Sequence, residues 1–88
     1  MVSTAEAIIK RIEQLAKRKG ISILKLSELS NVSQSTLNEI MNGRSKHPRI
    51  VTLRKIANGL GMSLAEFFDD DIFNDIDPDE RANSPRKK

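Results

Sequence analysis

The stretch VSQSTLNEIMNG, residues 32–43, determines how the rest of this 88-residue chain is interpreted. Ser33 belongs to the residue types that cap helix N-termini, and Gly43 follows where such a helix would end. Between them, three apolar residues recur on one side at helical spacing. The stretch therefore predicts a short helix that begins at Ser33 and runs to about residue 42, with a polar opposite face. Its inward-facing residues are Leu37, Ile40 and Met41.

A second short helix precedes it, with Ser22 as its N-cap and Asn31 at its end. We expect Leu26 and Leu29 to face inward from this helix. Two short helices joined by a turn of about three residues are the layout of a helix-turn-helix. Such helices cross closely, so a small residue is expected at the contact, and Ser27 supplies it. The turn needs a left-handed backbone, which asparagine tolerates best after glycine.

Three further helices are predicted from capping and periodicity. Capping-box patterns place one helix over residues 4–19 and open another near residue 64, while an apolar stripe marks a helix over about residues 51–60. No strand pattern is present. The sequence therefore predicts an all-α fold, a compact five-helix bundle over residues 1–76. The charged segment 77–88 is expected to be a disordered tail.

Residues 21–68 resemble the Xre or Cro/CI-type helix-turn-helix family of small transcriptional regulators. The resemblance rests on VSQSTLNEIMNG, on the basic loop RSKHPR, on TLRKIANGLGMSLAEFF and on their mutual spacing. It implies the five-helix DNA-binding domain of phage repressors, with the helix from Ser33 in the major groove of double-stranded DNA. Since no effector domain accompanies it, we expect a repressor that acts by occupying its operator.

Candidate base contacts lie on the outer face of the helix from Ser33. Gln34, in its first turn, can pair with the N6 and N7 atoms of adenine. Family members read bases from the positions that match Gln34, Ser35 and Glu39, and Asn38 shares their face. Glu39 has two interpretations, since its carboxylate either accepts from cytosine N4 or forms a salt bridge. The alternative for the whole set is a merely solvated polar face.

Candidate phosphate contacts lie around this helix. The resemblance assigns phosphate anchoring to Asn42 and a path along the DNA backbone to the loop cations. Ser22 can offer its hydroxyl or its helix N-terminus to a phosphate, because unpaired N–H groups attract anions there. Ile23 departs from the family, in which many members carry a glutamine that touches phosphate and braces the recognition helix. The loop cations are Arg44, Lys46 and Arg49.

Charge and composition limit the other function classes. Residues 1–68 carry eleven Lys or Arg against five Glu, a net +6, whereas residues 69–88 carry a net −3. The basic body favours a polyanionic partner. Cysteine is absent and histidine occurs once, so we expect no metal site, no cofactor and no catalytic residues; the chain is not expected to be an enzyme. No membrane segment is found, so a soluble, cytoplasmic protein is expected.

Two surface features leave alternatives open. Four cations of the first helix are expected to lie on its outer face and to act only as solubilising charges: Lys10, Arg11, Lys17 and Arg18. Three residues beyond the fifth helix are too apolar for a tail, and they can pack on the domain, pair two chains or dock a partner protein: Ile72, Phe73 and Ile76. We favour a homodimer. The alternative function is a protein-interaction or antitoxin-type module with the same fold.

Overall fold

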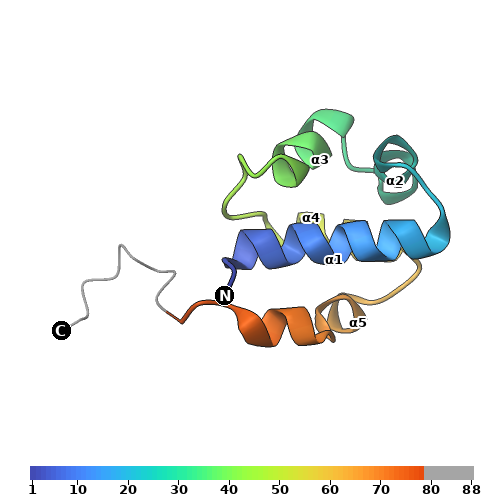
Figure 1. Ribbon diagram of the computed structural model, residues 1–88. Helices are drawn as coiled ribbons and strands as arrows, with labels where there is room; N and C mark the ends of the chain where they lie inside the picture. Colours follow the sequence, from blue (N-terminus) through green and yellow to red (C-terminus); the bar gives the residue numbers. More distant parts are fainter. Residues whose placement is uncertain (79–88) are drawn as a thin grey trace.

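The computed structural model describes residues 1–78, which form a bundle of five α-helices and one 3-10 helix. The helices are α1 (Thr4–Lys19), α2 (Ile23–Ser30), α3 (Gln34–Met41), α4 (Ile50–Gly59) and α5 (Leu64–Phe68), followed by η1 (Asp71–Asp75). In Figure 1, α2 and α3 lie on one side of α1, and α5 and η1 lie on the other. The predicted all-α five-helix fold is confirmed. Most of the expected tail lies outside the described residues.

Local sequence signals fix the helix ends where they were predicted. Ser3 and Ser63 each accept a hydrogen bond from the backbone of a glutamate three residues later, and each glutamate accepts one in return. The backbone amide of Ser3 donates to Glu6 and lowers the pKa of that carboxyl. Gly20 ends α1 in the left-handed conformation, with φ 68°. These contacts span three or four residues, which is why the sequence alone locates them.

One hydrophobic core joins all five α-helices. Its largest fully buried side chains come from every helix: Ile12, Leu26, Leu37, Ile56, Leu60 and Phe67. Each such side chain removed from water contributes about 1.5–3 kcal/mol to folding. The prediction for Leu29 is wrong, because its side chain is 49% exposed whereas Leu26 is fully buried. Helical spacing alone did not show which of the two leucines is buried.

Helices α2 and α4 cross closely at Gly59. A Cβ atom added to Gly59 would overlap the Oγ of Ser30 and lie 3.0 Å from the Ser30 backbone. Gly59, the last residue of α4, is thus the residue that lets α4 approach α2. Ser27, expected where the two helices of the helix-turn-helix touch, is buried, and its hydroxyl donates to the carbonyl of Leu24 at 2.7 Å. Ser30 is the residue of α2 that Gly59 approaches.

The chain beyond α5 folds back along α1. Asp70 caps η1 by accepting from the amide of Ile72 at 2.9 Å. Ile76 then pairs with Val2 in a single parallel bridge, and the amide of Asp77 donates to the carbonyl of Val2 at 2.9 Å. The N-terminus and the last described residues consequently lie together at one end of α1 (Figure 1). None of the helices within residues 1–78 is long and apolar enough to cross a membrane.

Candidate nucleic-acid interface

The turn between α2 and α3 sets the position of α3. Asn31 adopts φ 55° and ψ 40°, the left-handed conformation predicted for this turn. Val32 is buried behind the turn, and its amide donates to the carbonyl of Ser27 at 3.1 Å. Ser33 then caps α3 by accepting from the amide of Thr36 at 3.0 Å. The α2–α3 unit is therefore a helix-turn-helix, as the sequence predicts.

The two sides of α3 differ in burial. Leu37 and Ile40 are 0% and 2% exposed, so α3 is fixed against the core along this side. Gln34, Ser35 and Asn38 are exposed on the other side. No hydrogen bond within residues 1–78 holds any of these three side chains. Their amides and hydroxyl are consequently available to donate to, and accept from, an external partner.

Glu39, at the far end of this surface, forms an ion pair. Its Oε2 lies 3.3 Å from Nη1 of Arg44, and the two side chains are 45% and 71% exposed respectively. The sequence left open whether Glu39 meets a base or a cation, and in this structure it meets a cation. A pair this exposed stabilises the fold by at most about 1 kcal/mol.

The loop after α3 carries the remaining predicted cations. Arg44, Lys46 and Arg49 are exposed, and Arg49 is also the backbone N-cap of α4. Asn42 ends α3, and its Oδ1 accepts from the amide of Arg44 at 3.3 Å. A groove of about 380 Å³ separates this loop from α3, and it is lined by Thr36, Ile40, Ser45, His47, Pro48, Arg49 and Thr52. Hydroxyl and cationic donors around such a groove suit an anionic oxygen.

The start of α2 lies at the opposite end of the helix-turn-helix. Ser22 is exposed and caps α2 by accepting from the amide of Lys25 at 3.0 Å. Ile23, which takes the place of the bracing glutamine that the resemblance implies for many family members, is half-buried and packs against the hydrophobic core. Ile23 thus contributes packing where a glutamine would contribute a polar side chain.

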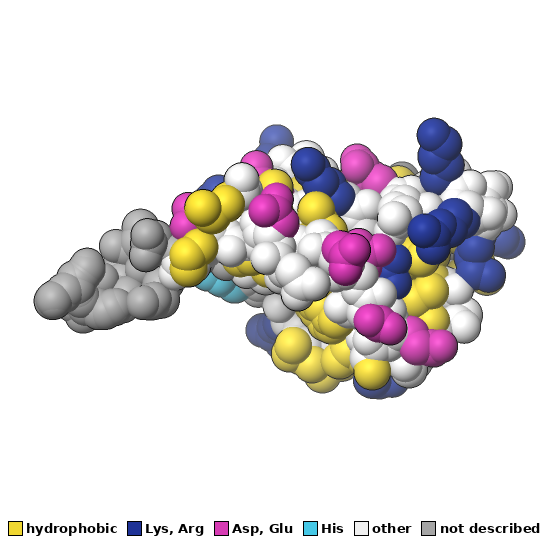
Figure 2. Space-filling model, turned by 60° about the horizontal axis from the view of Figure 1, so that its bottom comes forward, with side chains coloured by type: hydrophobic (Ala, Val, Ile, Leu, Met, Phe, Trp, Pro, Cys, Tyr) yellow, Lys and Arg dark blue, Asp and Glu magenta, His cyan; other side chains and the backbone are white. Residues whose placement is uncertain are grey.

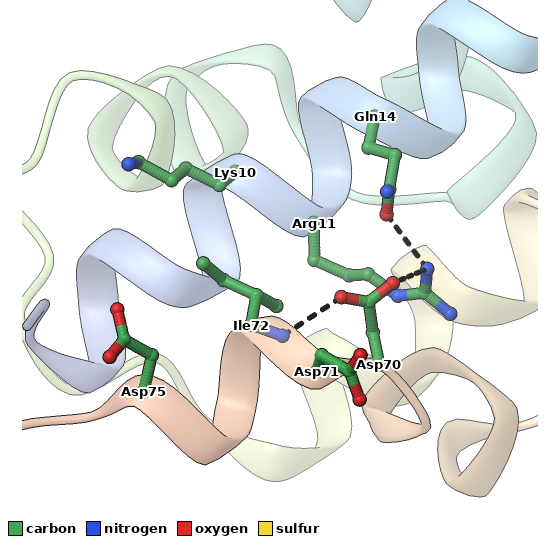
Figure 3. A pocket seen from close by; sticks show the side chains of 7 residues that line it. All are labelled: Lys10, Arg11, Gln14, Asp70, Asp71, Ile72 and Asp75. Atoms are coloured by element: carbon green, nitrogen blue, oxygen red, sulfur yellow. Dashed lines mark hydrogen bonds and ion pairs between the residues drawn. The ribbon is translucent and has the colours of Figure 1, made fainter.

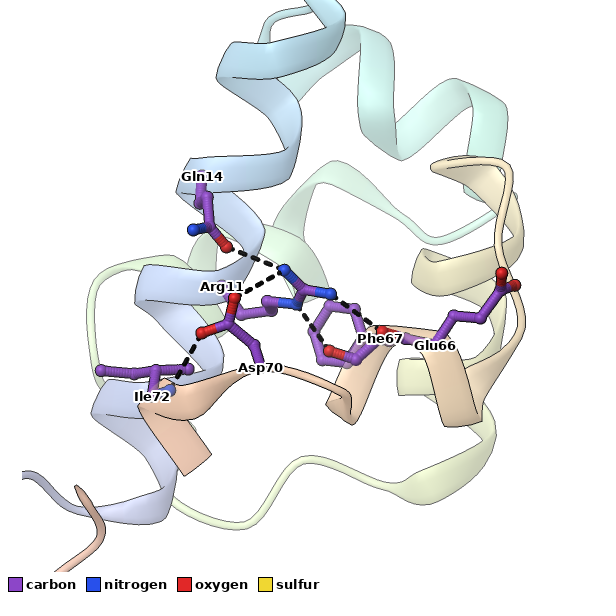
Figure 4. Close-up of polar contacts among 6 residues, drawn as sticks. All are labelled: Arg11, Gln14, Glu66, Phe67, Asp70 and Ile72. Atoms are coloured by element: carbon purple, nitrogen blue, oxygen red, sulfur yellow. Dashed lines mark hydrogen bonds and ion pairs between the residues drawn. The ribbon is translucent and has the colours of Figure 1, made fainter. Parts of the chain in front are cut away.

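Arg11 is the largest departure from the sequence analysis. Expected on the outer face of α1, it is only 6% exposed. Its Nε donates to the carbonyl of Phe67 at 2.6 Å, and its Nη2 donates to the carbonyl of Glu66 at 2.8 Å (Figure 4). Its Nη1 donates to Gln14 at 2.8 Å and to Asp70 at 3.1 Å. Arg11 therefore joins α1 to the last turn of α5 and to the cap of η1.

A signal for Arg11 was present in the sequence. Ile8, Arg11, Ile12 and Leu15 recur at spacings of three and four residues, so Arg11 lies on the buried stripe of α1. Arg11 was nevertheless predicted to be exposed because it is charged, and arginine is seldom fully buried unless it is paired. Lys10, Lys17 and Arg18 are exposed on α1 as expected, and their solubilising role stays a prediction.

A shallow hollow of about 410 Å³ lies beside Arg11, between α1 and η1. In Figure 3, the guanidinium of Arg11 meets the carboxylate of Asp70, and Lys10 points away from this pair. Four of the five N–H donors of Arg11 are used by its own chain, and its charge is paired with Asp70, so the guanidinium is not an unpaired cation beside this hollow. Within residues 1–78 no group of three His, Cys, Asp or Glu side chains is arranged to hold a metal ion.

The segment that contains Ile72, Phe73 and Ile76 packs on its own domain. The ring of Phe73 lies 4.9 Å from that of Phe68 and 6.2 Å from that of Phe67, measured between centroids. All three residues are half-buried, so part of each apolar side chain is still exposed. Figure 2 views the molecule from the side of η1 and shows acidic side chains spread across this face, with Lys and Arg at its right side and along its upper and lower edges.

Comparisons with known proteins agree with this geometry. A sequence profile of the family described as helix-turn-helix matches residues 12–67. The transcriptional regulator SlrR of Bacillus subtilis is 41% identical over 63 residues, which cover 70% of this chain and 41% of that protein. The transcriptional regulator PuuR of Escherichia coli is 34% identical over 59 residues, which cover 67% of this chain and 31% of that protein. This chain thus spans less than half the length of either relative.

A solved structure is similar across nearly the whole described fold. The crystal structure of the prophage Lp1 protein 11 superimposes with a TM-score of 0.74 at 33% sequence identity, over 86% of this chain and all of the other. The segment that the family profile matches, residues 12–67, includes α2, the left-handed turn at Asn31 and α3. The chain belongs to the helix-turn-helix family of the Xre and Cro/CI type.

Proposed function

We propose that this chain is a transcription regulator that binds double-stranded DNA in a sequence-specific manner, with α3 in the major groove. One observation carries the proposal. Gln34, Ser35 and Asn38 are exposed on the side of α3 that faces away from the core, and no group of residues 1–78 holds their side-chain polar atoms. A major groove accommodates one helix, and its base edges pair with such amides and hydroxyls.

Two groups of contacts are assigned different tasks. Gln34, Ser35 and Asn38 contact base edges, and Gln34 pairs with an adenine. Asn42, Lys46 and Arg49, together with the N-terminus of α2 at Ser22, contact phosphates and so position the domain without specifying a sequence. Arg44 differs from the other cations of the loop because its guanidinium is ion-paired with Glu39.

Binding-site selection from random duplex DNA tests this proposal. The wild-type chain should enrich one short motif, and Gln34→Ala should relax the preference at one adenine at a cost of about 1–3 kcal/mol. Lys17→Ala, an exposed change on α1 away from α3, is the control and should leave the motif unchanged. Equal weakening of all sequences by Gln34→Ala would reject the base contact, and failure to bind any duplex would reject the function.

We further propose that the chain binds as a homodimer and represses by occupying its operator. A two-fold dimer reads two half-sites about one helical turn apart, which doubles the few base contacts of each α3. Ile72 and Ile76 are the candidate interface residues, because each keeps apolar surface exposed. Phe73 supports them through its contacts with Phe67 and Phe68.

Sedimentation measures the dimer directly. Ile72→Asp should shift the chain to monomer because it places a charge in the apolar interface. Asn74→Asp adds the same charge at an exposed position of η1 and should leave the dimer intact. An intact dimer in Ile72→Asp would move the interface elsewhere, and a monomeric wild type at the concentrations that bind DNA would reject dimeric repression.

The alternative is a module that binds protein. It is supported by four large apolar side chains that are about half exposed or more: Leu24, Leu29, Ile50 and Val51. Exposed apolar residues in isolation are ordinary on protein surfaces, so this observation is weaker than the polar row on α3. Under this alternative no duplex motif is enriched.

A further inference from the structure

The C-terminal end of α3 is connected to the following loop through Glu39. The backbone carbonyl of Glu39 accepts from the amides of both Arg44 and Ser45 at 3.0 Å. Its side chain pairs with the Arg44 guanidinium at 3.3 Å. Backbone and side-chain contacts therefore fix Arg44 beside Glu39 on the surface that carries the exposed polar residues of α3.

An unpaired carboxylate at this place would oppose DNA binding, because phosphates line both edges of the groove that α3 enters. The Arg44 guanidinium compensates the negative charge of Glu39, because its Nη1 lies 3.3 Å from the Glu39 Oε2. No comparable pair is formed by Lys46 or Arg49 within the described part of the chain. Arg44 is consequently held beside α3 by an ion pair, whereas the side chains of Lys46 and Arg49 are not.

We propose that Glu39 and Arg44 act as one recognition element that reads a single G·C base pair at the C-terminal end of α3. The inference rests on the proposed function of DNA binding and adds a base preference to it. It also assigns Arg44 a role in specificity, where the resemblance to the family implies a phosphate contact.

The hydrogen-bonding groups of the pair match those of a G·C edge. In the major groove, guanine shows two acceptors, O6 and N7, and cytosine shows one donor, the N4 amino group. Arginine has five N–H donors, and the contact with Glu39 engages Nη1, which leaves donors for guanine. Glu39 uses Oε2 for Arg44, so Oε1 can accept from cytosine N4.

An A·T pair matches this element poorly. Adenine places its N6 amino donor where guanine has the O6 acceptor, so the guanidinium would meet a donor. Thymine places an acceptor, O4, where cytosine has a donor, so the carboxylate would meet an acceptor. The element should thus prefer G·C over A·T, whereas Gln34 prefers adenine at the other end of α3.

Binding-site selection with four variants tests the coupling. The variants are Glu39→Ala, Arg44→Ala, the double variant, and Lys46→Ala as the matched control from the same loop. The wild type should enrich a G·C pair at one position on the side of the motif that faces the loop. Each single variant should reduce that preference about tenfold, and the double variant should reduce it no further. Lys46→Ala should keep the preference and weaken all sequences alike.

Affinity measured against salt concentration separates the competing outcomes. Lys46→Ala should flatten the slope of log affinity against log salt by about 0.9, and Arg44→Ala should change it less. If Arg44→Ala instead weakens every sequence equally and flattens the slope like Lys46→Ala, Arg44 contacts phosphate and the inference is overturned. Additive losses in the double variant would overturn it as well. Failure of the wild type to bind any duplex would reject the proposed function itself, which is a different result.

Discussion

Arg11 and Arg49 are both arginines in a basic chain, yet the structure uses them in opposite ways. Arg11 is 6% exposed, and its guanidinium meets two carbonyls, an amide and a carboxylate of its own chain. Arg49 is exposed at the start of α4, with its side chain held by no hydrogen bond or ion pair from residues 1–78. The comparison teaches that burial separates a cation that joins elements of the fold, Arg11, from one whose donors stay free for an external partner, Arg49.

The largest expected effect is on the buried side of this comparison. Arg11→Ala should destabilise the fold by about 3 kcal/mol or more, because it removes a buried guanidinium that donates to Asp70 and to the Glu66 and Phe67 carbonyls. Urea unfolding measures the loss. Lys10→Ala, its exposed neighbour, should stay within about 0.5 kcal/mol of the wild type. A loss below about 1 kcal/mol for Arg11→Ala would show that the cluster does not hold α5 and η1 on α1.

The α2–α4 crossing should give the next largest effect. Gly59→Ala should lower the free energy of unfolding by about 1–2 kcal/mol. The new Cβ overlaps Ser30, and the cost of this overlap exceeds the gain in helix propensity from alanine. The cost should fall in a Ser30→Gly background, where the overlapping hydroxyl is gone. Base preference should be unchanged, since α3 does not take part in this contact. If Gly59→Ala left the free energy of unfolding unchanged or raised it, α2 and α4 would be able to move apart at little cost in free energy.

The smallest expected effect concerns the exposed side of the comparison. Arg49→Ala should leave the free energy of unfolding within about 0.5 kcal/mol. It should also weaken binding to all duplexes alike and flatten the salt dependence by about 0.9 in slope. Fluorescence anisotropy at several salt concentrations gives both values. An unchanged salt slope would place Arg49 away from the DNA backbone.

Sequence reasoning succeeded where the determining contacts are local. The caps at Ser3, Ser33 and Ser63 and the left-handed turn at Asn31 involve neighbours three to five residues away, and all four were predicted. Most of the fold follows from them together with the apolar stripes. The 3-10 helix over residues 71–75 was not predicted, because its apolar residues are too widely spaced among Asp and Asn.

The features that the sequence did not predict involve residues far apart in the chain. The contact between Arg11 and the Phe67 carbonyl joins positions 56 residues apart, and no local pattern encodes it. The approach of Gly59 to Ser30 depends on how two helices cross. The exposure of Leu29 reflects which side of α2 the core leaves uncovered. On α3, the sequence identified the outward-facing side chains, but the ion pair between Glu39 and Arg44 required the turn at Gly43 to be seen in three dimensions.

The central claim is that α3 and the following loop form the DNA-binding surface, and amide chemical shifts measured during titration with the selected duplex test it most directly. Perturbations should concentrate at Gln34, Ser35 and Asn38 and in residues 44–49. Residues of η1 and the buried Arg11 cluster should stay nearly unchanged. Perturbations centred on η1, or on the exposed leucines of α2 with α3 unchanged, would contradict the account.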